Sequence, residues 1–349
     1  MLRPTTFGSH VTHTHLTLTL ITLDINKLID DIISGYRIKD IDELLTIVEG
    51  TEPEALHEGC HRLTRTLHGD GFDTCTIINV KSGLCPEDCK WCAQSAHYST
   101  GCDTYDILET TRTTQQALHN ESLGVKRFSL VASGRRPSMK ETEKYVRLIK
   151  DIKKHSGIAC CASLGLATEE TLRPLREAGV ETYHCNMESA PSFFDTLCST
   201  HTQADKEETL KAAQRVGMRV CSGGIIGMGE DRRQRAEFAL YLASLGIRSI
   251  PLNILQPIPG TPLQSVERLT PEEVLLAVCM FRLANPEAYI RFSGGRGQLD
   301  RDTQRKALYI GVNAAITGDL LTTVASVTKE DMKLFKEMDY DTSAPTTWQ

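Results

Sequence analysis

The chain has 349 residues, of which 40% are hydrophobic, so it is long enough to bury a large core. Its 39 basic and 45 acidic residues give a formal net charge of −6, which offers no electrostatic basis for binding nucleic acid or an anionic membrane. No stretch reaches the roughly 18 continuous apolar residues of a membrane span. Twelve cysteines without a recognisable signal peptide favour a reducing compartment, so we expect a cytoplasmic protein that acts on a small molecule.

The first 22 residues alternate threonine with apolar residues and fit neither a signal nor a transit sequence. We expect residues 1–22 to be a disordered extension, with a metal role for His10, His13 and His15 as the alternative. From residue 24 to residue 68, apolar side chains recur at spacings of three and four. This periodicity predicts a helical lead-in.

After the lead-in, short β-rich runs alternate with amphipathic stretches. The predicted strands are residues 75–80, 127–132, 158–163, 181–186, 219–224, 247–255, 289–293 and 311–316. The predicted helices are residues 113–123, 140–155, 169–178, 207–216, 234–245, 271–283, 303–308 and 331–338. Strict alternation implies parallel strands with right-handed crossovers. Eight such units predict an α/β fold, a closed (β/α)8 barrel of the TIM type, although a partly open barrel would give the same pattern.

The predicted barrel spans residues 73–325, with a C-terminal helix and tail at 326–349, so residues 23–349 are expected to form a single domain. Alternate residues of a barrel strand face the lumen. In the fourth strand this alternation directs His184, Asn186 and Glu188 inward. Active sites of this fold lie at the carboxyl ends of the strands, so the loop after the first strand opens at the same mouth.

That loop carries Cys85, Cys89 and Cys92 at the spacing C-x3-C-x2-C. A loop at a strand end can fold back and direct three thiolates at one point. A structural zinc ion is usually closed by four ligands, whereas a reactive metal centre keeps one position open. No fourth ligand forms an obvious pair nearby, although His97 and Cys102 are candidates. An iron–sulfur cluster with one open iron is therefore favoured over zinc.

The stretch Gly-Leu-Cys-Pro-Glu-Asp-Cys-Lys-Trp-Cys-Ala-Gln-Ser at 83–95 resembles the biotin synthase family of the radical S-adenosylmethionine (SAM) superfamily. The similarity continues at 220–230 and at 289–296 (Tyr-Ile-Arg-Phe-Ser-Gly-Gly-Arg), and it covers about residues 24–338. The resemblance implies a sulfurtransferase with the radical SAM type of barrel. It would convert dethiobiotin to biotin by radical-SAM-dependent sulfur insertion, the last step of biotin biosynthesis.

The resemblance also implies how SAM binds. In the family, three thiolates, here Cys85, Cys89 and Cys92, hold a [4Fe-4S] cluster whose open iron is chelated by SAM. The other SAM positions implied are Ala132 and Ser133 near the methionine amino group, Asn186 and Glu188 near the ribose, Lys206 at the carboxylate, and Ile225 and Gly227 near the adenine. An exposed charge is the alternative for Lys206, and an ordinary β–α turn is the alternative for the glycine segment.

Asn253 resembles a residue that hydrogen-bonds the ureido ring of dethiobiotin, since an amide offers a donor and an acceptor. The alternative is a structural asparagine at a strand end.

A second, auxiliary cluster donates sulfur in the best-known branch of the family, where three cysteines and an arginine hold a [2Fe-2S] cluster. The matching positions here are Ser129, Cys161, Cys221 and Arg291, so one thiolate is missing. Serine is a poor replacement for a soft thiolate. We expect Cys198, on the loop after the fourth strand, to join Cys161 and Cys221 around a [2Fe-2S] cluster or a variant of it. The alternative is that Cys198 is a buried apolar thiol.

The remaining cysteines are interpreted as packing or incidental thiols: Cys60, Cys75, Cys102, Cys160, Cys185 and Cys279. Partners implied by the resemblance are dethiobiotin, a reducing flavodoxin or ferredoxin, iron–sulfur assembly proteins and a second copy in a homodimer. Two other functions stay open. One is a related radical SAM enzyme, such as a hydrogenase-cluster maturase, and the other is a non-catalytic zinc-binding barrel.

Overall fold

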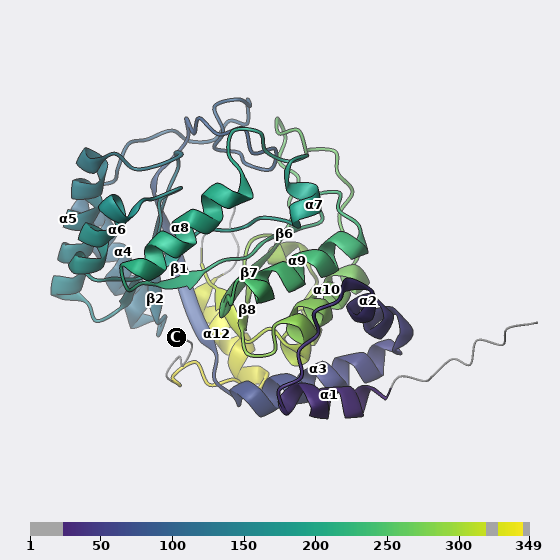
Figure 1. Cartoon of the computed structure of the whole chain (residues 1–349). Helices are drawn as coiled ribbons and strands as arrows, with labels where there is room; N and C mark the ends of the chain where they lie inside the picture. Colours follow the sequence, from purple (N-terminus) through teal and green to yellow (C-terminus); the bar gives the residue numbers. More distant parts are fainter. Residues whose placement is uncertain (1–23, 319–326, 345–349) are drawn as a thin grey trace, which may run out of the picture.

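The computed structural model describes residues 24–318 and 327–344 (Figure 1). The extension predicted at residues 1–22 lies outside the described residues. The strands are β1 (Asp73–Lys81), β2 (Arg127–Ala132), β3 (Ala159–Ser163), β4 (Val180–His184), β5 (Arg219–Cys221), β6 (Gly224–Ile226), β7 (Ser249–Ile254), β8 (Tyr289–Phe292) and β9 (Ala314–Ile316). All described pairings between these strands are parallel, in the order β5-β4-β3-β2-β1-β9-β8-β7-β6.

The two edge strands of this order, β5 and β6, are consecutive in the chain, so the sheet curls into a barrel. The backbone N–H of Glu188 donates to the carbonyl of Gly223 (3.0 Å), and that of Ser222 donates to the carbonyl of Ser249 (3.0 Å). The segment from β5 to β6 therefore bonds to the β4 side and to β7, and it serves as the fifth barrel strand. The eight-unit barrel is confirmed.

The single strand predicted at 219–224 is divided because its middle passes very close to both neighbours. A Cβ atom on Gly223 would lie 2.0 Å from the carbonyl oxygen of Pro251, and one on Gly224 would lie 2.2 Å from that of Glu188. Real side chains do not fit at such distances, so this crossing needs glycine at both positions.

Helices cover the outside of the barrel (Figure 1). They are α4 (Thr110–Ser122), α5 (Met139–His155), α6 (Glu169–Ala178), α8 (Gln203–Arg215), α9 (Arg232–Ser244), α10 (Pro271–Ala284), α11 (Arg301–Ile310) and the C-terminal α12 (Thr328–Glu337). Helix α5 shows how the sequence specifies them. Ser138 and Glu141 form a capping box at its start, and Tyr145, Leu148 and Ile152 are buried at helical spacing.

Three helices form the predicted lead-in: α1 (Ile25–Ile33), α2 (Ile41–Gly50) and α3 (Pro53–His68). The His68 Nε2 atom lies 2.9 Å from the carbonyl oxygen of Pro286, just before β8 begins. The lead-in therefore covers the amino ends of the strands. In Figure 1 it lies at the bottom, and the long loop after β1 lies at the top. Among the described helices, none is both long and apolar enough to cross a membrane.

Several predicted boundaries were wrong by a few residues, and two short helices were missed: α7 (Pro191–Phe194) and η1 (Arg296–Gln298). The fourth strand ends at His184 rather than at residue 186. The side chain of Asn186 accepts a hydrogen bond from the Gly223 N–H (3.0 Å), and Glu188 has a left-handed backbone with φ of 71°. The chain thus turns out of the strand where it meets the glycine crossing.

Candidate active site

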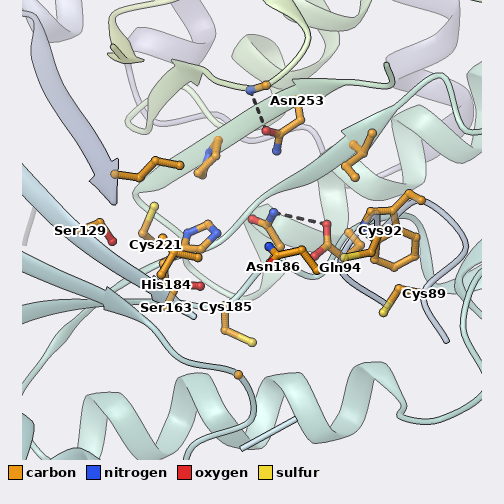
Figure 2. A pocket seen from close by; sticks show the side chains of 18 of the residues that line it. Cys89, Cys92, Gln94, Ser129, Ser163, His184, Cys185, Asn186, Cys221 and Asn253 are labelled. Atoms are coloured by element: carbon orange, nitrogen blue, oxygen red, sulfur yellow. Dashed lines mark hydrogen bonds between the residues drawn. The ribbon is translucent and has the colours of Figure 1, made fainter. Parts of the chain in front are cut away.

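A cavity of about 430 Å³ occupies the barrel lumen and opens at the carboxyl ends of the strands. Pockets of this size and position commonly bind small molecules. Two sets of three thiols line it: Cys85, Cys89 and Cys92 from the loop after β1, and Cys75, Cys161 and Cys221 from the strands. Cys185, just after β4, lines it as well. Figure 2 shows Cys89 and Cys92 on one side of the cavity and Cys221 with Ser129 on the other.

The loop after β1 is held by its own backbone. Cys85 N–H donates to the carbonyl of Gln94 (2.9 Å), Ala96 N–H to that of Cys85 (2.7 Å), and Cys92 N–H to that of Cys89 (3.0 Å). The hydroxyl of Ser133, just after β2, donates to the carbonyl of Gly83 (2.7 Å). These bonds fix a closed loop whose three thiols border the cavity.

The spacing of these three thiols does not fit a single ion. A tetrahedral zinc ion with bonds of about 2.3 Å holds its sulfur ligands about 3.8 Å apart. In the described part of the chain, the three ligand atoms that gather within 4.8 Å of one another belong to Cys89, Cys198 and His201, not to the three loop cysteines. The wider spacing leaves room for a cluster.

The expectation for Cys198 was wrong. Its Sγ atom lies 3.8 Å from Sγ of Cys89 and 3.2 Å from Oδ1 of Asp88, at the mouth loop and not with Cys161 and Cys221. Asp88 explains the position, because its carboxylate accepts from the backbone N–H of Ser199 (2.9 Å) and so ties the loop after α7 to the cysteine loop. The hydrogen bond from Cys89 lowers the pKa of Cys198 to about 4.

Three polar residues predicted to contact SAM line the cavity together: Asn186, Glu188 and Lys206. The Asn186 amide donates to Oε2 of Glu188 (3.3 Å). Burial raises the pKa of Glu188. Lys206 is a buried side chain of α8, not an exposed charge, and within the described residues no carboxylate forms a salt bridge with it. Burial lowers its pKa, but nearby Cys185 and Glu188 outweigh that effect and raise it overall.

The other predicted SAM residues divide into two groups. Ala132 and Ile225 line the cavity. Ser133 bonds the cysteine loop, as described above, and Gly227 N–H donates to the carboxylate of Glu230 (2.7 Å) in the turn after β6. Gly227 therefore shapes the turn that follows Ile225.

Asn253 lines the cavity at β7, and its amide also joins neighbouring strand ends. It donates to the carbonyl of Gly224 (2.9 Å) and accepts from Gly294 N–H (2.8 Å). An amide has two donor hydrogens and two acceptor lone pairs, so one of each is left for a ligand. The structural and the ligand-binding interpretations are therefore compatible.

The deep end of the cavity combines thiols with buried charges. Arg291 donates to the carboxylate of Asp73, and Arg127 Nε donates to the same carboxylate (3.0 Å). Cys221 Sγ lies 3.2 Å from Ser249 Oγ, and burial raises its pKa.

Two deep residues were not predicted to have a functional role. Cys75 was interpreted as packing, but it lines the cavity and its thiol hydrogen-bonds that of Cys161. As the acceptor from Cys75, and with Arg127 nearby, Cys161 has its pKa lowered to about 7. His184 also lines the cavity, and burial lowers its pKa to about 4, so it is neutral at pH 7. The period-two pattern of β1 was the available signal for Cys75.

Two family models match the chain. The Radical SAM superfamily matches residues 79–242, and the Biotin and Thiamin Synthesis associated domain matches residues 251–341. A biotin synthase of Porphyromonas gingivalis is 57% identical over 308 residues, covering 88% of this chain and 93% of the relative. A biotin synthase of Parabacteroides distasonis is 50% identical, covering 91% and 97%.

Solved structures share the fold. Methylornithine synthase superposes with a TM-score of 0.78 at 17% identity, covering 90% of this chain and 96% of that one. A maturase of the [FeFe]-hydrogenase gives 0.75 at 15% identity, covering 91% and 74%. The barrel, the cysteine loop and the first family model define a radical SAM enzyme. Within that superfamily, the chain belongs to the biotin synthase family and has biotin synthase function.

Proposed function

We propose that this chain uses one cavity for both halves of the conversion of dethiobiotin to biotin. The observation that carries the proposal is that two separate sets of thiols line the same cavity, one at its mouth and one deep in the barrel. Polar side chains of β4, β7 and α8 line it as well. A substrate bound between the mouth thiols and the deep thiols could react with groups held at either end of the cavity.

At the mouth, Cys85, Cys89 and Cys92 would hold a [4Fe-4S] cluster. Three thiols too widely spaced for one ion, with no fourth ligand completing the set among the described residues, fit a cluster that keeps one iron open. With SAM bound there, this cofactor supplies the 5′-deoxyadenosyl radical chemistry of the superfamily. The protein binds, orients and shields the reactants, and the enclosed barrel suits that task.

The polar residues of the cavity would orient SAM and the substrate. Lys206 offers a buried ammonium that fits the SAM carboxylate, and Glu188 with Asn186 offers acceptors and a donor for the ribose hydroxyls. Ala132 and Ile225 would contact the rest of SAM. The free donor and acceptor of Asn253 fit the ureido ring of dethiobiotin.

In the lumen, Cys161, Cys221 and Arg291 would contribute to an auxiliary iron–sulfur cluster that supplies the inserted sulfur. Soft thiolates are the preferred ligands of such clusters, and both cysteines line the cavity. We further propose a cytoplasmic homodimer that receives electrons from a flavodoxin or ferredoxin and iron from iron–sulfur assembly proteins.

The proposal is tested by incubating the anaerobically reconstituted, reduced protein with SAM and dethiobiotin. Mass spectrometry should detect biotin together with methionine and 5′-deoxyadenosine. Formation of 5′-deoxyadenosine without biotin would leave the radical step intact and overturn the substrate. A colourless protein with stoichiometric zinc would overturn the cluster at the mouth.

A further inference from the structure

We propose that Cys75 is a ligand of the auxiliary cluster and, with Cys161 and Cys221, supplies the third thiolate that Ser129 does not. The inference rests on the proposed function, because it assumes that the lumen holds an iron–sulfur cluster. It replaces Cys198, which the structure sets against Cys89 at the mouth.

The register of the strands brings Cys75 and Cys161 to one level of the barrel. Cys75 on β1 pairs with Arg127 on β2, and Arg127 pairs with Ala159 on β3. In a (β/α)8 barrel the strands tilt relative to the barrel axis. Residues at the same height along the axis are therefore not paired residues: on each next strand, the residue at that height lies about one position further along the chain than the paired residue. Two strands on from β1, that level is reached at Cys161, two residues after Ala159.

The same shift of about one residue per strand gives the residue at this height on β5. Cys161 pairs with Thr182 on β4, and Thr182 pairs with Arg219 on β5, so two strands on the level is reached at Cys221. Cys221 in turn contacts Ser249 of β7 (3.2 Å).

Ser249 pairs with Tyr289 on β8, and two residues further is Arg291. Cys75, Cys161, Cys221 and Arg291 thus form one layer of four side chains from alternate strands, the arrangement expected in this fold.

Side-chain contacts agree with this layer. The thiols of Cys75 and Cys161 hydrogen-bond each other, and the Arg291 guanidinium interacts electrostatically with Cys75 and Cys221. All four side chains are buried and line the cavity. Three thiols and one guanidinium therefore converge at one level, matching in kind the three cysteines and one arginine implied by the family resemblance.

Ser129 belongs to the neighbouring layer. It comes from β2, an even strand of the barrel, and by the same rule it shares its level with His184 of β4. Its hydroxyl is a hard, high-pKa donor that suits iron–sulfur chemistry poorly. Position 129 on β2 therefore offers no thiol, whereas Cys75 on the adjacent strand β1 does.

Charge balance at the deep end also favours thiolates there. Arg127 and Arg291 bring two guanidinium groups to the carboxylate of Asp73, all three of them buried. Both guanidinium groups act electrostatically on the thiols of Cys75 and Cys221 and favour their thiolate forms.

The test compares Cys75→Ser with Cys160→Ala in the full-length protein. Cys160 is a matched control, because it is a buried thiol adjacent to Cys161 but packs in the helix-facing core. Each protein is reconstituted anaerobically with 57Fe and sulfide. Its iron content and Mössbauer spectrum are recorded, and SAM cleavage to 5′-deoxyadenosine reports the mouth cluster independently.

We expect C75S to lose the auxiliary signal while retaining the mouth cluster and SAM cleavage, and C160A to match the wild type. A full auxiliary signal in C75S overturns the assignment of Cys75 as a ligand but leaves the proposed auxiliary cluster in place. Equal loss of both clusters in C75S also overturns it, since that pattern indicates a general structural defect. A wild-type protein that binds iron only at the mouth overturns the proposed auxiliary cluster, and the assignment of Cys75 with it.

Discussion

The mouth and the lumen of the barrel both offer three thiols, but the chain assembles them differently. At the mouth, Cys85, Cys89 and Cys92 lie within one loop that its own backbone hydrogen bonds close. In the lumen, Cys75, Cys161 and Cys221 come from three separate strands, and the barrel register alone brings them to one level. A local site is specified by spacing, whereas a distributed site depends on the fold. We therefore expect a substitution at the mouth to affect one loop, and we expect a neighbouring strand to be able to compensate for one in the lumen.

The largest effect is expected at the mouth. Cys89→Ala removes a proposed ligand of the [4Fe-4S] cluster, so SAM cleavage should fall by more than about 100-fold, beyond the effect of residues that only support a ligand. Production of 5′-deoxyadenosine is the measurement. The auxiliary Mössbauer signal should persist, and its loss in C89A would show that the two sites are not independent.

A cysteine introduced at position 129 should restore the auxiliary cluster that C75S loses. In the double variant C75S/S129C the thiol sits on β2, next to Cys161 in the register, at the position where the best-known branch of the family carries cysteine. We expect the auxiliary Mössbauer signal and biotin formation to return at least in part. An unchanged deficit relative to C75S would show that a thiol on β2 cannot take over the role of one on β1.

Cys198 provides the contrasting substitution. Because its thiol lies against Cys89, Cys198→Ala should leave the auxiliary iron at the wild-type level. The mouth loop loses one buried contact, so a reduction in mouth-cluster affinity of up to about 10-fold is expected. Mössbauer spectra of the two sites separate these effects, and selective loss of auxiliary iron in C198A would favour the original expectation.

Lys206 should affect SAM binding more than turnover. Lys206→Met removes a buried ammonium that is proposed to meet the SAM carboxylate, at a cost of about 2 kcal/mol or roughly 30-fold in SAM affinity. Lys206→Arg keeps the charge and should lose less. Separate KM and kcat values for SAM decide this, and a fall in kcat alone would argue against a direct contact with the carboxylate.

The smallest effect is expected on stability, at Asp88. Burial alone would raise its pKa, but hydrogen bonds from Ser199 and Thr200 outweigh burial and hold it well below the ordinary value of 3.8. A depressed carboxyl pKa stabilises the fold above the ordinary value, and this contribution is lost as the pH falls below it. Asp88→Asn should therefore cost about 1 kcal/mol at pH 7, a modest value because the carboxylate is partly exposed.

Denaturant unfolding of D88N and the wild type at pH 7 and near pH 3 measures this difference. The difference between the two proteins should be smaller at the lower pH, because the unfolded chain already binds protons there. A difference in unfolding free energy that is the same at both pH values would show that the charge of Asp88 is not responsible.

Sequence patterns predicted the eight barrel strands and the cysteine loop because both depend on local periodicity and spacing. They did not predict the division of the fifth strand, which follows from the close approach of Gly223 to Pro251. They also assigned Cys198 to the auxiliary cluster and interpreted Cys75 as a packing or incidental thiol. Neither the position of Cys198 against Cys89 nor that of Cys75 on the cavity wall was predicted, since neither the hydrogen bonds of Asp88 nor the stagger between β1 and β3 can be derived from spacing along the chain.

The origin of the inserted sulfur distinguishes the two sites most directly. Wild-type protein and C75S are reconstituted with 34S-sulfide, freed of excess sulfide, and incubated with SAM and dethiobiotin under reducing, anaerobic conditions. We predict 34S-labelled biotin from the wild type. C75S, with the mouth cluster alone, should form 5′-deoxyadenosine but no biotin. Labelled biotin from C75S at the wild-type level, or unlabelled biotin from the wild type, would contradict a sulfur-donating cluster held by Cys75, Cys161 and Cys221.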